Sequence, residues 1–168
     1  MHTDQTNEIF RLRAHHGMCL AYFEGKGYSD TFTAHMGQIR AQLEADPEQI
    51  VEWVTQTDVI CGACPNNVDG VCSSAEKVER YDRVVMRALR QALQQDEKEA
   101  AQGDIYPPEN TGNNACTKPL KMTYAAFSKR VREHILIAGK RSEICGDCQW
   151  NEICREKDRK LKRAMTLC

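Results

Sequence analysis

The chain has 168 residues, of which 41% are hydrophobic and 28% are charged, and its formal net charge is -1. This length predicts a single domain, residues 1–168, with one hydrophobic core. The balanced charge gives no general attraction to nucleic acid or to an anionic membrane surface. No apolar run approaches the roughly 20 residues that span a bilayer, and the polar start of the chain differs from a secretory signal. We therefore expect a cytoplasmic protein that does not associate with membranes.

The first part of the chain predicts one helix and one short strand. An alternating polar and apolar stretch, residues 9–13, comes before them. Ser29 can cap a helix that Pro47 ends. The apolar stripe of this helix consists of Phe32, Met36, Ile39 and Leu43. Residues 50–55 are rich in β-branched side chains and predict a short strand.

Three further helices are predicted in the rest of the chain. The first starts with Ser73 and Glu76, which have the spacing of a capping box. Its apolar stripe continues through Val78, Tyr81, Val85, Ala88 and Ala92. The second begins near Thr123 and ends near Gly139. The third is a basic C-terminal helix at about residues 150–165.

A segment rich in glycine and proline separates the first two of these helices. Residues 102–121 predict no regular structure. They form most of an expected inserted loop at about residues 95–121.

Nine cysteines are the unusual feature of the composition. In a short secreted protein such a density indicates a disulfide framework, but this chain shows no export signal and the count is odd. Thiols stay reduced in the cytosol, where clustered cysteines hold metal or carry out redox chemistry. Cysteine usage therefore favours a metal site over disulfides.

Six of the cysteines form two loops with similar spacing. The first is a C-x2-C-x7-C pattern made of Cys61, Cys64 and Cys72. The second is a C-x2-C-x5-C pattern made of Cys145, Cys148 and Cys154. Two residues between cysteines allow one tight turn that directs both sulfurs to the same side. The predicted fold class is therefore mainly α: a small helical domain with two cysteine-rich metal-binding loops and at most a short β element.

A glycine follows the first cysteine of each loop. These residues, Gly62 and Gly146, are expected to adopt a positive φ that points backbone N–H groups toward the sulfurs. Such hydrogen bonds, together with the partial positive charge of a helix N-terminus, would stabilise a negatively charged cluster.

The third cysteine of each loop bears on the choice of metal. Zinc is commonly held by two C-x2-C pairs, which would leave the third cysteines without a role. Iron–sulfur clusters take four thiolates, often from a local triplet and one remote residue. The loops therefore favour one or two iron–sulfur clusters of the [4Fe-4S] type, with zinc as the alternative. Two triplets could serve two clusters or converge on one. The candidate ligands are Cys19, Cys61, Cys64, Cys72, Cys145, Cys148 and Cys154, followed by His15 and His16.

Cys19 is the best remote candidate for a fourth ligand. On a helical turn it shares a face with His15 and His16, which precede it by four and three residues. Histidine can replace cysteine on a cluster iron. Cys116 lies in the proline-rich segment and Cys168 is the last residue, so both are expected to be free thiols.

Several motifs resemble those of an uncharacterised prokaryotic family, domain of unknown function 1284. The opening run RAHHGMC, from Arg13 to Cys19, is followed by FEGKGYS at residues 23–29. Later come a C-x2-C-P loop that starts at Cys61 and a C-x2-C-x-W stretch that starts at Cys145.

The resemblance runs from about Ile9 to Cys154 and is interrupted by the inserted loop. It departs from the family pattern at Ala14, where a proline is expected. The resemblance implies iron–sulfur binding and a role for Cys19 and the two histidines, and it implies no reaction.

Three functions remain open. We favour electron transfer to or from a redox partner protein, because no nucleophile–base pair or phosphate loop indicates a reaction. The alternatives are an enzyme or maturation factor that uses an open cluster iron near the histidines, and a zinc-binding structural or regulatory module. Nucleic-acid binding is not expected, since Glu156 and Asp158 dilute the basic tail.

Overall fold

A three-stranded sheet forms one end of the molecule. The structure is a computed structural model and describes residues 10–100 and 118–166. The strands are β1 (Phe10–Arg13), β2 (Ile50–Val54) and β5 (Leu120–Thr123). Their order is β1-β2-β5, with β1 parallel and β5 antiparallel to the central β2. The predicted strand at residues 50–55 is therefore confirmed as the centre of this sheet.

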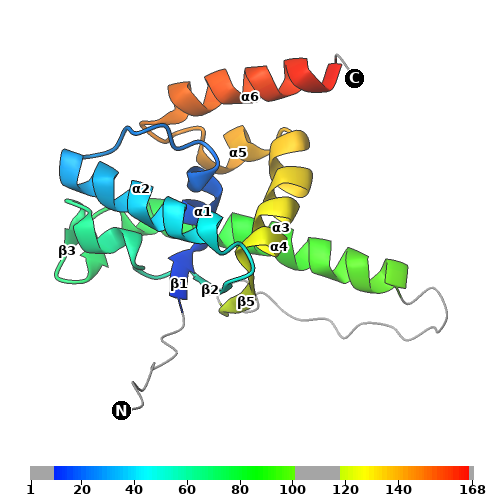
Figure 1. The fold of residues 1–168 in the computed structure, drawn as a ribbon, viewed down its shortest axis with the longest axis horizontal. Helices are drawn as coiled ribbons and strands as arrows, with labels where there is room; N and C mark the ends of the chain where they lie inside the picture. Colours follow the sequence, from blue (N-terminus) through cyan, green and yellow to red (C-terminus); the bar gives the residue numbers. More distant parts are fainter. Residues whose placement is uncertain (1–9, 101–117, 167–168) are drawn as a thin grey trace, which may run out of the picture.

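Helices make up most of the described chain, which confirms the mainly α fold class. They are α1 (Ala14–Leu20), α2 (Asp30–Ala45), α3 (Ala75–Ala100), α4 (Tyr124–Val131), its π-helical continuation η3 (Arg132–Ile137), α5 (Arg141–Cys145) and α6 (Asn151–Thr166). A 3-10 turn, η1 (Ile60–Ala63), leads into a small hairpin of β3 (Asn67–Val68) and β4 (Val71–Cys72). In Figure 1, α1 lies at the centre and α6 crosses the end opposite the sheet.

Short sequence signals set most helix boundaries. Ser29 caps α2 by accepting a hydrogen bond from the N–H of Phe32 at 3.1 Å, as predicted. Thr123 caps α4 through the N–H of Ala126 at 3.1 Å. Helix α3 begins at Ala75, so Ser74 rather than Ser73 directly precedes it.

Part of the expected inserted loop has regular structure. Helix α3 runs on to Ala100, and Leu120 and Lys121 pair with the central strand as part of β5. The prediction that residues 102–121 lack regular structure is therefore wrong at its C-terminal end. The remainder of the loop, residues 101–117, lies outside the described residues.

Gly17 allows α1 to pack closely on the core. Trp53 of β2 and Phe127 of α4 are fully buried and stack with ring centroids 3.4 Å apart and planes at 9°. A Cβ at Gly17 would overlap the Trp53 ring and lie 2.6 Å from Cε1 of Phe127. Only a glycine therefore fits at this point of α1. The close packing of Gly17 on the aromatic pair fixes the position of α1 and of the residues next to Gly17.

We expect Gly17→Ala to lower the free energy of unfolding by about 1–3 kcal/mol, because the added methyl group forces apart a closely packed aromatic pair. The matched control is Gly37→Ala in α2, where a Cβ would meet Phe23 at an ordinary 3.6 Å. Alanine in a helix interior is favoured over glycine by roughly 0.5–1 kcal/mol, so the control should stabilise. Urea unfolding of both variants measures the two changes in the free energy of unfolding. Stabilisation of both variants, or destabilisation of both, would contradict this packing argument.

Candidate metal centre

Four cysteines from opposite ends of the sequence line one pocket. Cys19 comes from α1, Cys145 from the end of α5, Cys148 from the next turn, and Cys154 from α6. His15, His16 and Arg141 also line the pocket, and its apolar walls include Met36 of α2 and Ile153 of α6. The structure thus brings the predicted remote residue Cys19 together with the second cysteine triplet.

Local backbone turns arrange the second triplet. The N–H of Cys148 donates to the carbonyl of Cys145 at 3.1 Å, and the N–H of Asn151 donates to the carbonyl of Cys148 at 3.0 Å. The first of these bonds closes the tight turn that the C-x2-C spacing predicts. The second leads directly into α6, so Cys154 follows in the first turn of a helix.

The expected role of the two loop glycines is wrong. Gly146 has a φ of -63°, and Gly62 is not among the glycines with positive φ. Gly146 is required for another reason, since a Cβ there would overlap the carbonyl oxygen of Ser142. A Cβ at Gly62 would meet no atom within 4 Å, and nothing in the structure explains a glycine at this position.

A buried network fixes the orientation of His15. Oδ1 of Asp82 accepts a hydrogen bond from Nδ1 of His15 at 2.7 Å and another from its backbone N–H at 2.9 Å. Oδ2 of Asp82 pairs with Arg13 at 2.7 Å. Burial is the largest cause that lowers the pKa of His15, so its neutral ring donates through Nδ1 and keeps Nε2 as an acceptor.

His16 is held by a second carboxylate. Oδ2 of Asp58 accepts from Nδ1 of His16 at 2.8 Å and from the backbone N–H of Arg13 at 2.6 Å. Oδ1 of Asp58 accepts from the backbone N–H of Cys61 at 3.0 Å. Burial raises the pKa of Asp58, but His16 and these N–H groups outweigh burial and lower it. The carboxylate thus ties α1 to the start of the first cysteine loop.

The first cysteine triplet does not line the pocket of the second. Cys61 is buried in η1, where its carbonyl accepts from the N–H of Cys64 at 3.1 Å. Cys72 lies on β4 and pairs with Asn67 of the hairpin. Among the described residues, one group of three ligand types has its atoms within 4.8 Å of one another: His16, Asp58 and Cys61.

All seven cysteines in the described ranges are free thiols. Burial is the largest cause that raises the pKa of Cys19, Cys61, Cys64, Cys145 and Cys154, to about 12 for Cys61 and about 11 for Cys154. These thiols are therefore protonated at neutral pH without metal, and a bound metal has to displace their protons. Cys116 and Cys168 lie outside the described residues.

Sequence reasoning missed two charged residues, Arg141 in the pocket wall and Asp58, which holds the pocket residue His16. Asp58 precedes Cys61 by three residues, a spacing at which a side chain can cap a turn, and this was the available signal. Arg141 is buried beside Cys145 and pairs with Asp158 of α6 at 2.7 Å. No local pattern distinguishes Arg141 from the exposed arginines around it.

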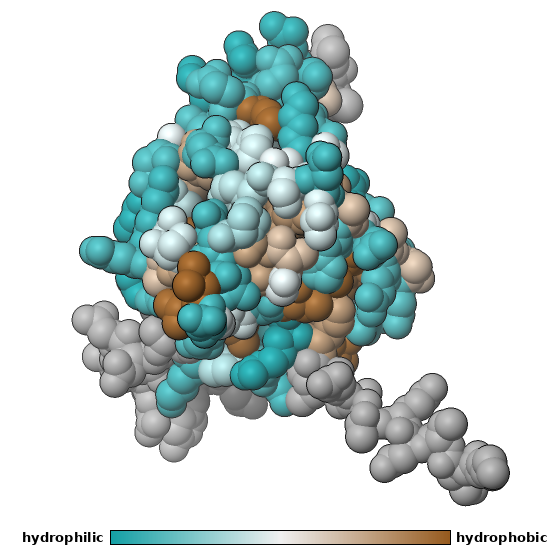
Figure 2. All heavy atoms as spheres, turned by 90° about the vertical axis from the view of Figure 1, so that its left-hand side faces the viewer, coloured by the Kyte–Doolittle hydropathy of each residue, from teal (hydrophilic) through white to brown (hydrophobic). Residues whose placement is uncertain are grey.

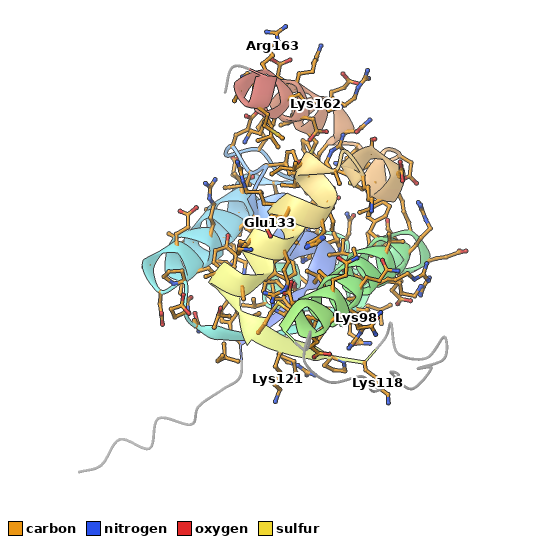
Figure 3. The ribbon with its side chains drawn as sticks, turned by 90° about the vertical axis from the view of Figure 1, so that its right-hand side faces the viewer. Lys98, Lys118, Lys121, Glu133, Lys162 and Arg163 are labelled. Carbon is orange, nitrogen blue, oxygen red and sulfur yellow. The ribbon has the colours of Figure 1, made fainter. Side chains whose placement is uncertain are left out.

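The surface of the molecule mixes apolar and charged side chains. Figure 2 views the molecule from the side of the β3–β4 hairpin and shows apolar patches between polar ones; Val68 and Val71 of the hairpin are exposed. The labelled basic side chains form two separate groups in Figure 3, with Lys162 and Arg163 on α6 and Lys98, Lys118 and Lys121 at the opposite end. No helix in the described ranges has the length and apolarity to cross a membrane.

The fold and the pocket define a small, mainly helical protein with a cysteine-rich candidate metal site. The chain belongs to the family described as protein of unknown function (DUF1284), whose model matches residues 27–154. The matched range contains both cysteine loops and begins after the segment with His15, His16 and Cys19. No curated protein and no solved structure matches the chain.

Proposed function

We propose that this protein binds a [4Fe-4S] cluster through Cys19, Cys145, Cys148 and Cys154. The observation that carries this proposal is the meeting of four thiols in one pocket. One comes from the N-terminal part of the chain and three come from a local triplet near the C-terminus. A triplet with one remote thiolate is a familiar way to ligate such a cluster.

The spacing of the thiols supports a cluster over a single zinc ion. At a Zn–S distance of about 2.3 Å, tetrahedral geometry places the sulfurs about 3.8 Å apart. Among the described residues, no three of the pocket thiols form a group whose ligand atoms all lie within 4.8 Å. A cluster separates its thiolates by its own width and therefore tolerates this wider spacing.

The size of the pocket supports the same choice. The cavity has a volume of about 120 Å³. By this measure a single water needs only about 10–15 Å³. The pocket therefore has room for a polyatomic group.

Electron transfer is the role that we favour for the bound cluster. The cluster supplies the redox chemistry, and the chain sets its potential through burial, charge and hydrogen bonds. The four thiols alone supply the four ligands that such a cluster takes. His15 and His16 also line the pocket, and carboxylates hold their Nδ1 atoms and so orient both rings there.

A single zinc ion at His16, Asp58 and Cys61 is the second candidate. One observation favours it: the three possible ligand atoms all lie within 4.8 Å of one another. Against it, Asp58 already accepts hydrogen bonds from Arg13, His16 and Cys61. Its carboxylate is better placed to orient the imidazole than to ligate a metal.

Metal analysis of protein purified without oxygen tests the proposal. We expect about four iron and four acid-labile sulfide per chain, with a brown colour and a broad visible absorbance. Zinc alone, without sulfide or colour, would contradict the proposal and support the second candidate. Twice these amounts of iron and sulfide would place a further cluster at the first loop.

A further inference from the structure

Arg141 is a buried cation with an incomplete set of hydrogen bonds. The residue is only 1% exposed. Its Nε donates to Oδ2 of Asp158 at 2.7 Å, and its Nη1 donates to Oδ1 of Asn151 at 3.0 Å and to Sγ of Cys145 at 3.7 Å. Nη2 is buried and has no hydrogen-bond partner among the described residues. Leaving a buried charged donor unpaired is costly, so a partner from outside the chain is expected.

The position of Arg141 identifies the kind of partner. Arg141 lines the pocket together with the four thiols, and it lies one helical turn before Cys145, whose Sγ donates to its carbonyl at 3.5 Å. Two other arginines, Arg90 and Arg130, have a buried Nε without a partner, but neither lines the pocket. The unpaired donor of Arg141 therefore belongs to the site where anionic sulfur would be bound.

We infer that Nη2 of Arg141 donates a hydrogen bond to the cluster held by the four thiolates and thereby raises its reduction potential. This inference rests on the proposed function. On reduction, one electron passes from an external donor such as dithionite to the bound cluster, which gains one negative charge while no bond is made or broken. A fixed positive charge and a hydrogen-bond donor stabilise the more negative form and so favour uptake of the electron.

The test is a redox titration of the iron-loaded protein and of Arg141→Gln, followed by electron paramagnetic resonance. We expect the equilibrium constant for reduction to fall about tenfold in the variant, which is a decrease of about 59 mV for a one-electron couple. Arg141→Lys keeps a charge without the planar fork and should give a smaller decrease. An unchanged potential in Arg141→Gln would overturn the inference.

Asp158→Asn is the matched control, because it weakens the same attachment of α6 but keeps the guanidinium. Removing this carboxylate takes away a negative charge, so the potential should stay the same or rise. If both variants lower the potential equally, looser packing of α6 explains the change and the inference is wrong.

A measurement on the unaltered chain covers the case in which Arg141→Gln fails to hold a cluster. Protein labelled with ¹⁵N in the arginine guanidinium groups is reduced and studied by pulsed electron paramagnetic resonance. A ¹⁵N coupling to the cluster supports the inference, and its absence overturns it. If the unaltered protein contains no iron and no sulfide, the proposed function itself fails, which is a separate result.

Discussion

Cys19→Ala should abolish the binding of iron and sulfide by the pocket. Cys19 is the one pocket thiol that comes from outside the second triplet, and its loss leaves three thiols for a cluster that takes four. Alanine is a strong helix former, so α1 should persist. Iron and sulfide analysis and the visible spectrum measure the loss, and far-UV circular dichroism checks the helices.

Cys72→Ala is the matched control for this variant. Cys72 is half-buried on β4 and does not line the pocket. Its replacement should leave the iron content and the spectrum as in the unaltered protein. If Cys19→Ala keeps its cluster, Cys19 is not a ligand. If Cys72→Ala loses the cluster as well, the two cysteine loops share one centre.

Asp82→Ala should lower the free energy of unfolding by about 3–5 kcal/mol. The Asp82 side chain is fully buried, pairs with Arg13 at 2.7 Å, and accepts two hydrogen bonds from His15. Removing one partner of a buried ion pair leaves the other charge uncompensated, and this makes the loss large. Urea unfolding at pH 7 measures it.

Asp96→Ala on the same helix is the control. Its carboxylate is half-exposed and pairs with Arg130 at the surface, so its loss should cost no more than about 1 kcal/mol. Similar losses in the two variants would contradict the assignment of Asp82 as the central carboxylate of the network.

The Asp82 effect should also depend on pH. Burial raises the pKa of Asp82, but His15 and Arg13 outweigh burial and lower it. A carboxyl group with a lowered pKa in the folded state stabilises the protein above its unfolded pKa of about 3.9 and loses that contribution on further acidification. The difference in free energy of unfolding between the unaltered protein and Asp82→Ala should therefore become smaller as the pH falls below about 4.

Regular patterns made most helices and both cysteine loops predictable. The stripe from Phe32 to Leu43 is buried on α2, and the cap at Ser29 forms as expected. Cys19 is predictable as the remote candidate because it follows two histidines on one helix, and the structure brings it to the second loop. These patterns are local. Periodic burial and helix capping involve residues only a few positions apart, so the sequence alone shows them.

The features that sequence reasoning missed depend on contacts between distant segments. Strand β5 has four residues and exists because Leu120 and Lys121 pair with β2, about 70 positions earlier. Arg141 reaches Asp158 on another helix, and Asp58 reaches His16 on α1. No pattern within a window of the sequence encodes these pairs. The positive φ expected at Gly146 was wrong because close packing on Ser142, and not backbone conformation, selects glycine there.

The wide separation of Cys19 from its three partners has a consequence for the newly made protein. Cys154 is synthesised 135 residues after Cys19. At about 5–20 residues per second, the ribosome takes roughly 7–27 s to cover that distance. The first cysteine loop emerges during this interval, and Cys154 is the last of the four pocket thiols to be synthesised. The set of four thiols is therefore complete only after Cys154 has been made, and iron offered before that point would meet an incomplete set.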